Sequence, residues 1–344
     1  MSQHVAYSPE GTFGSWQTPA KFLHVDSCSI QAARENVKLQ QTGIGRGRYM
    51  SIPGAKPVNG SLALPWWQSG VLPFFQSVLK TQHIQTVSTG IYDHGLAFND
   101  AVANGSFSIQ QQFGGSVNLN ILGAVCKAFK ITAAAKSQAQ LNFDFEAKDE
   151  APAGGTWDYN GAASPAVVTP VVYTSPVRPL MFYDCEVKLG GTCSYSGSTG
   201  KITVSGGAAT KLIGTVDISV DLGLDSEAYA LATPDPTRQW FYPGNRAIAI
   251  TLDVLWLTRD LTFYNAMRAA SKVTLELNIA GAIIGSTYKQ EAHICIPHWV
   301  IDTAKLPDIA SDETPKRQAV SGEAILEATT GMDFGMWIRT TEAT

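Results

Sequence analysis

The residues between positions 293 and 298 come closest to the spacing of a metal site. His293, Cys295 and His298 form the pattern His-x-Cys-x-x-His, and alternate residues of a strand share one face. Imidazole and thiolate are both ligands of Zn²⁺. Pro297, however, interrupts a strand before His298, and no fourth ligand is evident nearby. We therefore expect packed or hydrogen-bonded side chains here, and the sequence predicts no metal site and no cofactor.

The other candidates for chemistry are weaker. His24, Asp26 and Cys28 would also share a strand face, but nothing supplies the geometry of a catalytic triad. The alternating glycines of residues 43–47 lack the spacing and the strand-then-helix context of a nucleotide-binding loop. Pairs of carboxylates on exposed strands become catalytic only in a cleft. The sequence therefore predicts that the protein is not an enzyme.

The composition is that of a folded protein with an unusually low charge. Of 344 residues, 16% are charged and 44% are apolar, and the formal net charge is −4. This is enough apolar side chain to build a sizeable core. A weakly acidic net charge without basic clusters argues against a dedicated nucleic-acid binder. The five cysteines are scattered, and without a secretory signal we expect reduced, buried thiols. No apolar stretch is long enough to span a membrane.

Alternating apolar and polar residues dominate the chain and predict strands with one apolar and one polar face. The clearest examples are residues 141–146, 216–222 and 275–279. Helical periodicity is rare and predicts two short helices, over residues 72–80 and 259–271. The Asn-Gly pairs at 59–60 and 104–105 predict hairpin turns. The fold class is therefore mainly β and antiparallel, with one short helix per unit.

Two features divide the chain into two like units. Residues 151–179 are rich in Ala, Gly and Pro and read as a linker, which leaves one domain at 1–150, with an N-terminal arm, and a second at 180–344. A repeat with an offset of 190 residues also links the two units. It aligns Pro53-Gly54 with Pro243-Gly244, and Leu62, Leu64 and Trp66 with Leu252, Val254 and Trp256. Each aligned segment then runs into a predicted helix, which favours a duplicated domain.

Four segments resemble the major tail tube proteins of long-tailed bacteriophages. They are residues 51–66 followed by a short apolar helix, residues 123–150 with their closing Lys-Asp-Glu, residues 186–227, and the closing strands from His293 to Gly331. The resemblance covers most of residues 20–340. The duplication differs from the single-domain members of that family and suggests the duplicated tube-domain type.

The resemblance implies both a fold and a function. The fold is two tandem tail-tube β-sandwich or barrel domains, each with a short flanking α-helix, which contribute strands to an intersubunit β-barrel. The function is a structural virion subunit that self-assembles into stacked pseudo-hexameric rings, forming a hollow conduit for genome ejection. Duplication implies trimeric rings, although a hexamer with decorating second domains fits the same length.

The resemblance also implies partners and a location. The chain would contact other copies of itself and the tape measure, tail terminator and tail-tip proteins, while genome DNA passes without tight binding. It would not bind a membrane. It would reside in the phage tail after assembly in the host cytoplasm.

The long polar loops at 42–51 and 225–242 are the expected contacts between rings. Loops rich in glycine can order against a neighbour, and arginine and large aromatic residues are favoured at interfaces. We also expect Arg246 to pair with carboxylates of the next ring. The alternative is an ordinary surface loop that its own domain covers. The interface candidates are Gly43, Gly45, Arg46, Gly47, Arg48, Tyr49, Arg238, Trp240, Phe241 and Tyr242.

Four acidic residues on the polar faces of predicted strands are candidates for the lumen: Asp144, Glu146, Asp217 and Asp221. A lysine-lined bore would hold DNA through counterion release, whereas an acidic or neutral bore lets DNA slide. The alternative is that these carboxylates face solvent on the outside of the protein.

Two other functions stay open at this stage. One is another virion β-ring component, from the tail tip or the neck. The second is a two-domain carbohydrate-binding β protein, which would need an exposed aromatic platform, for example Trp66, Trp67 and Trp256. The position of these tryptophans at the end of apolar alternation argues instead for a core or a subunit interface.

Overall fold

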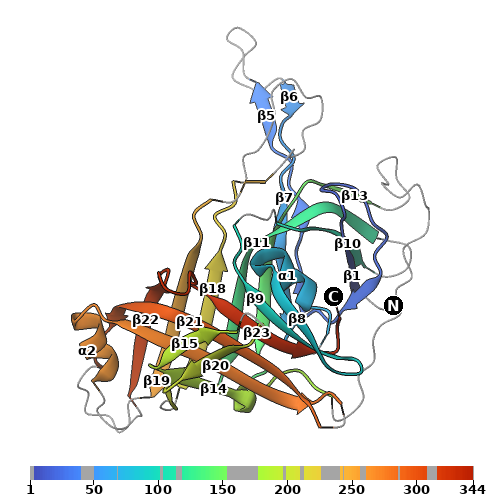
Figure 1. Cartoon of the computed structure of the whole chain (residues 1–344). Helices are drawn as coiled ribbons and strands as arrows, with labels where there is room; N and C mark the ends of the chain where they lie inside the picture. The colour runs from blue at the N-terminus through green and yellow to red at the C-terminus, as the bar shows by residue number, and fades with distance from the viewer. Residues whose placement is uncertain are drawn as a thin grey trace.

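The computed structural model describes residues 4–39, 50–67, 69–100, 104–113, 118–152, 177–196, 199–209, 213–225, 241–242, 244–255, 261–285, 287–307 and 316–343. These residues form a mainly β protein with two α-helices, α1 (Leu72–Leu79) and α2 (Thr262–Arg268), as Figure 1 shows. The prediction of a mainly β fold with two short helices is confirmed.

The strands fall into two sets in chain order. The first set is β1 (His4–Pro9), β2 (Lys21–Leu23), β3 (Ser27–Cys28), β4 (Gln31–Ala32), β5 (Asn36–Leu39), β6 (Met50–Pro53), β7 (Val58–Pro65), β8 (Thr81–Ser88), β9 (Ile91–Ala97), β10 (Ser106–Gln112), β11 (Asn118–Ala134), β12 (Gln140–Ala147) and β13 (Asp149–Pro152). The second set, after a 3-10 turn at Phe182–Asp184, is β14 (Cys185–Leu189), β15 (Thr192–Tyr195), β16 (Ile202–Ser205), β17 (Ala208–Ala209), β18 (Ile213–Asp221), β19 (Ala247–Leu255), β20 (Lys272–Ile283), β21 (Lys289–Ala304), β22 (Arg317–Ala324) and β23 (Gly335–Thr340).

The long strand β11 organises the first set. One of its edges pairs with β12 and then β13, and its other edge pairs with β10 and then β18. The sheet continues from β12 to β7 and on to β3 and β4, while β10 leads to β1 and β2. The register along β11 shifts between Cys126 and Ala128, which is typical of a β-bulge.

The second set repeats this order of pairing around β21. One edge of β21 pairs with β22 and β23, and its other edge pairs with β20. The sheet then continues from β22 to β19 and β18, while β20 leads to β14 and β17. The register along β21 also shifts, between Ile301 and Thr303, next to β22. The strands β7 and β19, which carry the sequence repeat, therefore hold the same place in their halves, and each is followed by a helix.

The pairing of β11 with β18 joins the two halves. It is antiparallel and runs from Ala128 opposite Asp221 to Ala134 opposite Thr215. One sheet therefore continues through β3 and β4, β7, β12, β11, β18, β19, β22 and the end of β21, and we call it the joint sheet. Within the described residues, no pairing links the end of β21 back to β3 or β4, so the joint sheet is open.

Aromatic side chains fill the core between the joint sheet and α1. Phe74 and Phe75 of α1 are fully buried, and each ring lies 5.3 Å from that of Phe143 on β12. In the second half, Phe263 of α2 packs edge-on against Trp299 of β21. Burying each such ring contributes about 1.5–3 kcal/mol. Helices this short are unstable in isolation, so both are stabilised mainly by tertiary packing.

Three local predictions need correction. Both helices are shorter than predicted: α1 ends at Leu79, because Lys80 takes a left-handed conformation with φ 63°, and α2 spans only Thr262–Arg268. Asn59-Gly60 forms no turn but lies inside β7, where Gly60 approaches the Ser29 carbonyl too closely for a side chain. A Cβ is excluded there, which explains the glycine without a hairpin.

The predicted linker lies largely outside the described residues. At its start, Ala151 and Pro152 belong to β13 and pair with β11. At its end, Leu180 is fully buried beyond the linker.

Candidate functional site

The joint sheet presents one continuous polar face, which we call the joint face. Its residues alternate with core residues, and consecutive strands align them in register. They are Asn59, Ser61, Ala63, Asn142, Asp144, Ala128, Lys130, Thr132, Thr215, Asp217, Ser219, Asp221, Ala249, Thr251, Asp253, Arg317, Ala319, Ser321 and Glu323. The opposite face is apolar: Ile131, Ile218, Ile250 and Val320 are fully buried. Strand alternation in the sequence therefore produces the predicted two-faced sheet.

Asp144 and Asp221 lie on the joint face on either side of β11. Each lies opposite Ala128, on β12 and β18 respectively, so about two strand spacings, or roughly 10 Å, separate them. The pKa of Asp144 is raised above its ordinary value by burial and by the charge of Asp221, although Lys127 acts in the opposite direction. The two carboxylates therefore repel each other electrostatically across the sheet.

The other two lumen candidates take part in ion pairs. Glu146 is buried and its Oε1 lies 3.3 Å from Nζ of Lys127. Asp217 lies 3.2 Å from Nζ of Lys130 and accepts a 2.6 Å hydrogen bond from the Thr132 hydroxyl. Asp144, Glu146, Asp221 and Lys127 line one shallow hollow of about 370 Å³, whereas Asp217 lies farther along β18.

Carboxylates outnumber cations on strands β7, β12, β11, β18, β19 and β22 of the joint sheet. The carboxylates are Asp144, Glu146, Asp217, Asp221, Asp253 and Glu323, and the cations are Lys127, Lys130 and Arg317. Each of these cations pairs with a carboxylate: Lys127 with Glu146, Lys130 with Asp217 and Arg317 with Asp253. The pairs of Lys130 and Arg317 are partly exposed and contribute little stability, but all three pairs neutralise their cations. The face therefore carries an excess of negative charge.

Most of the interface candidates lie outside the described residues: Gly43, Gly45, Arg46, Gly47, Arg48, Tyr49, Arg238 and Trp240. Of the other two, Phe241 is partly buried and its ring packs edge-on against Phe13, 5.6 Å away. Tyr242 is 63% exposed.

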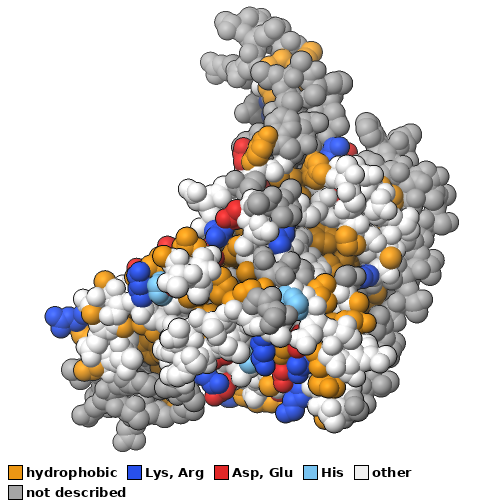
Figure 2. Space-filling model, viewed as in Figure 1, with side chains coloured by type: hydrophobic (Ala, Val, Ile, Leu, Met, Phe, Trp, Pro, Cys, Tyr) orange, Lys and Arg blue, Asp and Glu red, His pale blue; other side chains and the backbone are white. Residues whose placement is uncertain are grey.

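Strands β5 and β6, which flank residues 40–49, form an arm that projects from the body in Figure 1. Its apolar side chains Val37, Met50 and Ile52 are exposed, and Figure 2 shows apolar side chains on this arm. An exposed apolar arm of this kind is typical of an element that packs against another molecule.

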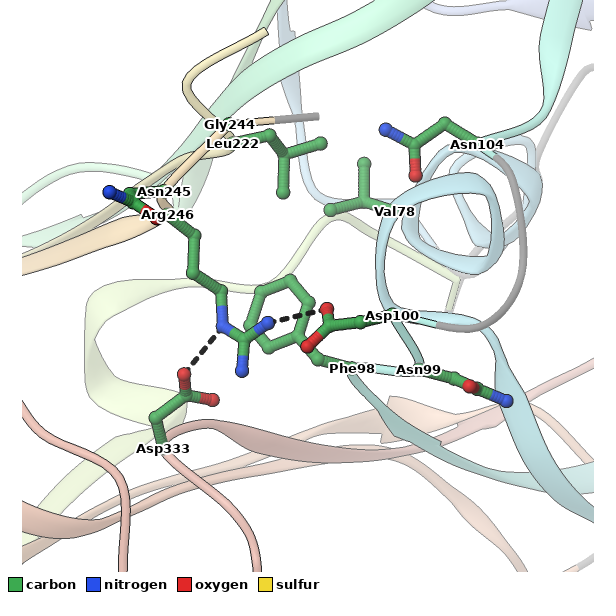
Figure 3. A pocket seen from close by; sticks show the side chains of 10 residues that line it. All are labelled: Val78, Phe98, Asn99, Asp100, Asn104, Leu222, Gly244, Asn245, Arg246 and Asp333. Carbon is green, nitrogen blue, oxygen red and sulfur yellow. Dashed lines mark hydrogen bonds and ion pairs between the residues drawn. The ribbon is translucent and has the colours of Figure 1, made fainter. Parts of the chain in front are cut away.

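Arg246 pairs with two carboxylates of its own chain. Its guanidinium contacts Asp100 at 2.6 Å and Asp333 at 2.5 Å and lies over the ring of Phe98, as Figure 3 shows. Burial lowers the pKa of Arg246, but the hydrogen bonds that it donates to Asp333 and Asp100, together with their negative charges, raise the pKa further than burial lowers it. Asp100 follows β9 and Asp333 precedes β23, so Arg246 ties the two halves together beside a cavity of about 540 Å³.

The sequence signal for Arg246 lies in the repeat. The fourth residue of the Pro-Gly segment is Lys56 in the first half and Arg246 in the second. Lys56 forms a corresponding ion pair, with Asp149 at 2.5 Å. A cation at the same place of both repeat copies would have indicated an ion pair within the chain.

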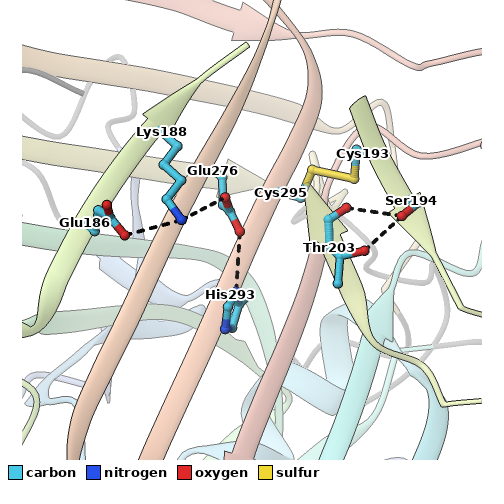
Figure 4. A network of polar contacts seen from close by, with 8 residues as sticks. All are labelled: Glu186, Lys188, Cys193, Ser194, Thr203, Glu276, His293 and Cys295. Carbon is cyan, nitrogen blue, oxygen red and sulfur yellow. Dashed lines mark hydrogen bonds and ion pairs between the residues drawn. A yellow bond between two sulfur atoms is a disulfide. The ribbon is translucent and has the colours of Figure 1, made fainter. Parts of the chain in front are cut away.

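The residues of the His-x-Cys-x-x-His pattern have structural contacts. Nδ1 of His293 lies 3.4 Å from Glu276, which also faces Lys188, as Figure 4 shows. Cys295 forms a disulfide with Cys193. Among the described residues, no group of three His, Cys, Asp or Glu side chains is placed to hold a metal ion.

The prediction of reduced thiols is wrong for Cys193 and Cys295. The hairpin of β15 and β16 lies over β21 and brings together two residues that are 102 positions apart. Spacing in the sequence cannot reveal such a pairing. Cys28, Cys126 and Cys185 remain free thiols, and burial raises the pKa of Cys28 to about 11 and of Cys185 to about 12.

The triad-like residues also have structural partners. The ring of His24 packs edge-on against that of Phe22, 5.0 Å away, and at a tilt against that of Trp67, 5.2 Å away. Asp26 accepts a hydrogen bond from the Gln140 amide. None of the helices in the described part of the chain has the length and hydropathy to cross a membrane.

The repeated strand order and the broad polar face of an open sheet are typical of structural proteins that associate through their sheets. The comparison with known families agrees with this class. A family described as phage tail tube protein matches residues 2–332, and the chain belongs to that family. It is therefore a structural subunit of a phage tail tube, part of the virion, and it associates with copies of itself. A search of curated proteins finds no match.

Proposed function

We propose that this chain folds as two tandem tube domains, residues 1–150 and 180–344, and polymerises into stacked rings that form a hollow conduit for genome DNA. The observation that carries this proposal is the pairing of β11 with β18, which already merges the sheets of two like halves into one. Rings of three copies would then imitate six-fold rings, because each copy supplies two equivalent halves.

The size of the joint sheet fits a conduit. The sheet has eight strand positions per chain when β3 and β4 are counted as one. Three copies would give 24 strands, and a closed barrel of that number, tilted by about 40° and spaced at about 4.8 Å, has a backbone diameter of about 48 Å. Such a barrel is wider than those that leave an aqueous channel at 16–18 strands.

The joint face is the proposed wall of the lumen. Its excess of carboxylates disfavours the counterion release on which DNA affinity depends, so that DNA passes without tight binding. The apolar opposite face and the helices lie outside this wall. The loops at 42–51 and 225–242, with the arm of β5 and β6, are the proposed contacts between rings.

The proposed partners follow from this role. They are neighbouring copies in the ring and in stacked rings, together with the tape measure, tail terminator and tail-tip proteins. Assembly would take place in the host cytoplasm, and the protein would have no catalytic activity.

Negative-stain electron microscopy of the purified protein tests the proposal. We expect hollow tubes or stacked rings, and a monodisperse monomer at every concentration would contradict it. Counting copies per particle separates this role from that of a tail-tip or neck ring, because a tube needs many rings and the other components need about one.

A further inference from the structure

We propose that the end of β21 pairs with β3 and β4 of a second copy, in the same register that joins β11 to β18 within one chain. This inference rests on the proposed function and names the edges and the register that would join neighbouring copies. The argument uses the internal repeat as a template, because both halves share one order of strand pairing.

The end of β21 occupies the place of the end of β11. In the first half, Phe129 of β11 lies opposite Phe143, which lies opposite Leu62 of β7. In the second half, Ala304 of β21 lies opposite Val320, which lies opposite Leu252 of β19. Since Leu62 and Leu252 are equivalent in the sequence repeat, Ala304 corresponds to Phe129.

The register shifts support this correspondence. The shift in β11 comes directly before Ala128 and the shift in β21 directly before Thr303, so Thr303 corresponds to Ala128. Continuing along the chain, Leu306 corresponds to Ile131.

Strands β3 and β4 occupy the place of β18. Val220 of β18 lies opposite Ile248 of β19, and Ala32 of β4 lies opposite Val58 of β7. Val58 and Ile248 are equivalent in the repeat, so Ala32 corresponds to Val220. By the same count, Ile30 corresponds to Ile218 and Ala33 to Asp221.

The register between copies follows from the register within the chain. Phe129 lies opposite Val220, Ile131 opposite Ile218, and Ala128 opposite Asp221. The equivalent pairs place Ala304 opposite Ala32 of a second copy, Leu306 opposite its Ile30, and Thr303 opposite its Ala33.

The exposure of Leu306 indicates that this edge lacks its neighbour. Leu306 is 41% exposed, whereas Ile131, at the equivalent position, is fully buried. An apolar side chain at a core position of an open sheet edge is typical of a surface that another strand covers.

The opposite edge is protected in the single chain by side chains. The amide of Ala33 donates to Pro57 of β7, so by alternation the amide of Ala32 points to the other edge, where it donates to Glu150 at 2.6 Å. The carbonyl of Ile30 accepts a 2.6 Å hydrogen bond from the Gln111 amide. These side chains satisfy groups that an incoming strand would otherwise bind, which protects the edge until a second copy takes their place.

A designed disulfide tests the register. The pair Thr303 and Ala33 corresponds to Ala128 and Asp221. The amide of Ala32 faces the open edge, whereas the amide of Ala33 faces β7. Thr303 and Ala33 would therefore form a non-hydrogen-bonded pair, with a Cα separation of about 4.5 Å that suits a disulfide. The double variant Thr303→Cys/Ala33→Cys should give covalent oligomers after mild oxidation, with a closed trimer as the largest abundant species on a non-reducing gel.

The matched control is Thr303→Cys/Gln31→Cys, which displaces the pair by two residues and should cross-link at least tenfold less. Stronger cross-linking of the displaced pair, or none at either pair in tubes that form normally, would overturn the inference. Cross-linked oligomers without tubes would support the inference and contradict the conduit. Absence of both cross-links and tubes would contradict both.

A second variant tests the edge without a new bond. Leu306→Asp should give a folded chain, judged by circular dichroism, that no longer forms rings. The control is Ile84→Asp on β8, because Ile84 has the same exposure of 41% but lies away from the proposed edge. Normal rings from folded Leu306→Asp would overturn the inference.

Discussion

At the scale of single residues, Arg246 is one of the side chains that connect the two halves. Its carboxylate partners come from the first half at Asp100 and from the second at Asp333. Asp333 is mostly buried, so the loss of its partner leaves a buried charge without compensation. The link is a property of the single chain and precedes any contact with another copy.

We expect Arg246→Ala to lower the free energy of unfolding by about 1–3 kcal/mol, because a charged hydrogen-bond network with a buried member is broken. Urea denaturation at neutral pH measures the change. The control Arg34→Ala removes an exposed arginine and should stay within about 0.5 kcal/mol of the parent. Equal stability of Arg246→Ala and the parent would show that the ion pairs of Arg246 with Asp100 and Asp333 do not stabilise the fold.

Asp144 gives a prediction about pH. Its pKa in the folded chain is raised by burial and by Asp221, against the effect of Lys127, so the folded state binds this proton more tightly than the unfolded state. Stability from this group is therefore present at acid pH and is lost as the pH rises through the raised pKa. We expect Asp144→Asn to stabilise the fold at pH 7 and to lose this advantage towards pH 4.

Urea denaturation at the two pH values measures the difference for Asp144→Asn. The control is Asp253→Asn, which removes the partner of Arg317 and should not stabilise the fold at pH 7. A stabilisation by Asp144→Asn that is the same at both pH values would exclude the proposed titration.

At the scale of elements, alternation predicted the apolar faces of β12, β18 and β20, although Glu146 and Glu276 of the predicted polar faces are buried. Helical periodicity located both helices within a few residues. What failed depends on contacts between distant segments. The disulfide of Cys193 needs the β15–β16 hairpin to lie over β21, and Gly60 in β7 is explained only by the approach of Ser29. Local sequence carries no information on such contacts, whereas the repeat, which is itself long-range, did indicate that β7 and β19 are equivalent.

The arm of β5 and β6 gives the prediction at this scale. Deleting residues 43–48, which lie outside the described residues, should leave a soluble, folded chain, because the deletion removes no described core residue. We expect this variant to lose tube formation if the loop contacts the next ring. Circular dichroism and negative-stain microscopy measure the two properties, and tubes of normal length would contradict the proposed contact.

At the scale of the whole molecule, the joint face decides how the proposed conduit treats DNA. The acidic excess includes Asp144 and Asp221, which lie on either side of β11. Reversing both charges with Asp144→Lys/Asp221→Lys should convert the wall into a surface that retains DNA. Each lysine that neutralises a phosphate should make the slope of log K against the logarithm of salt concentration more negative by about 0.9. Parent tubes should show no such affinity.

A DNA co-sedimentation assay at several salt concentrations measures retention by tubes of the double variant. The control is Glu186→Lys on β14, which adds a cation away from the joint face. Equal DNA retention by the control and the double variant would place the joint face outside the conduit.

The covalent connection between β11 and β18 has a consequence for the kinetics of growth. When two halves are part of one polypeptide, the contact between them forms at a high effective concentration during folding and does not wait for diffusion. In a ring of three copies, every second junction would be complete before any molecules meet. Nucleation would then depend on a lower power of subunit concentration than in a ring of six separate domains, so that assembly could start while the protein is still scarce.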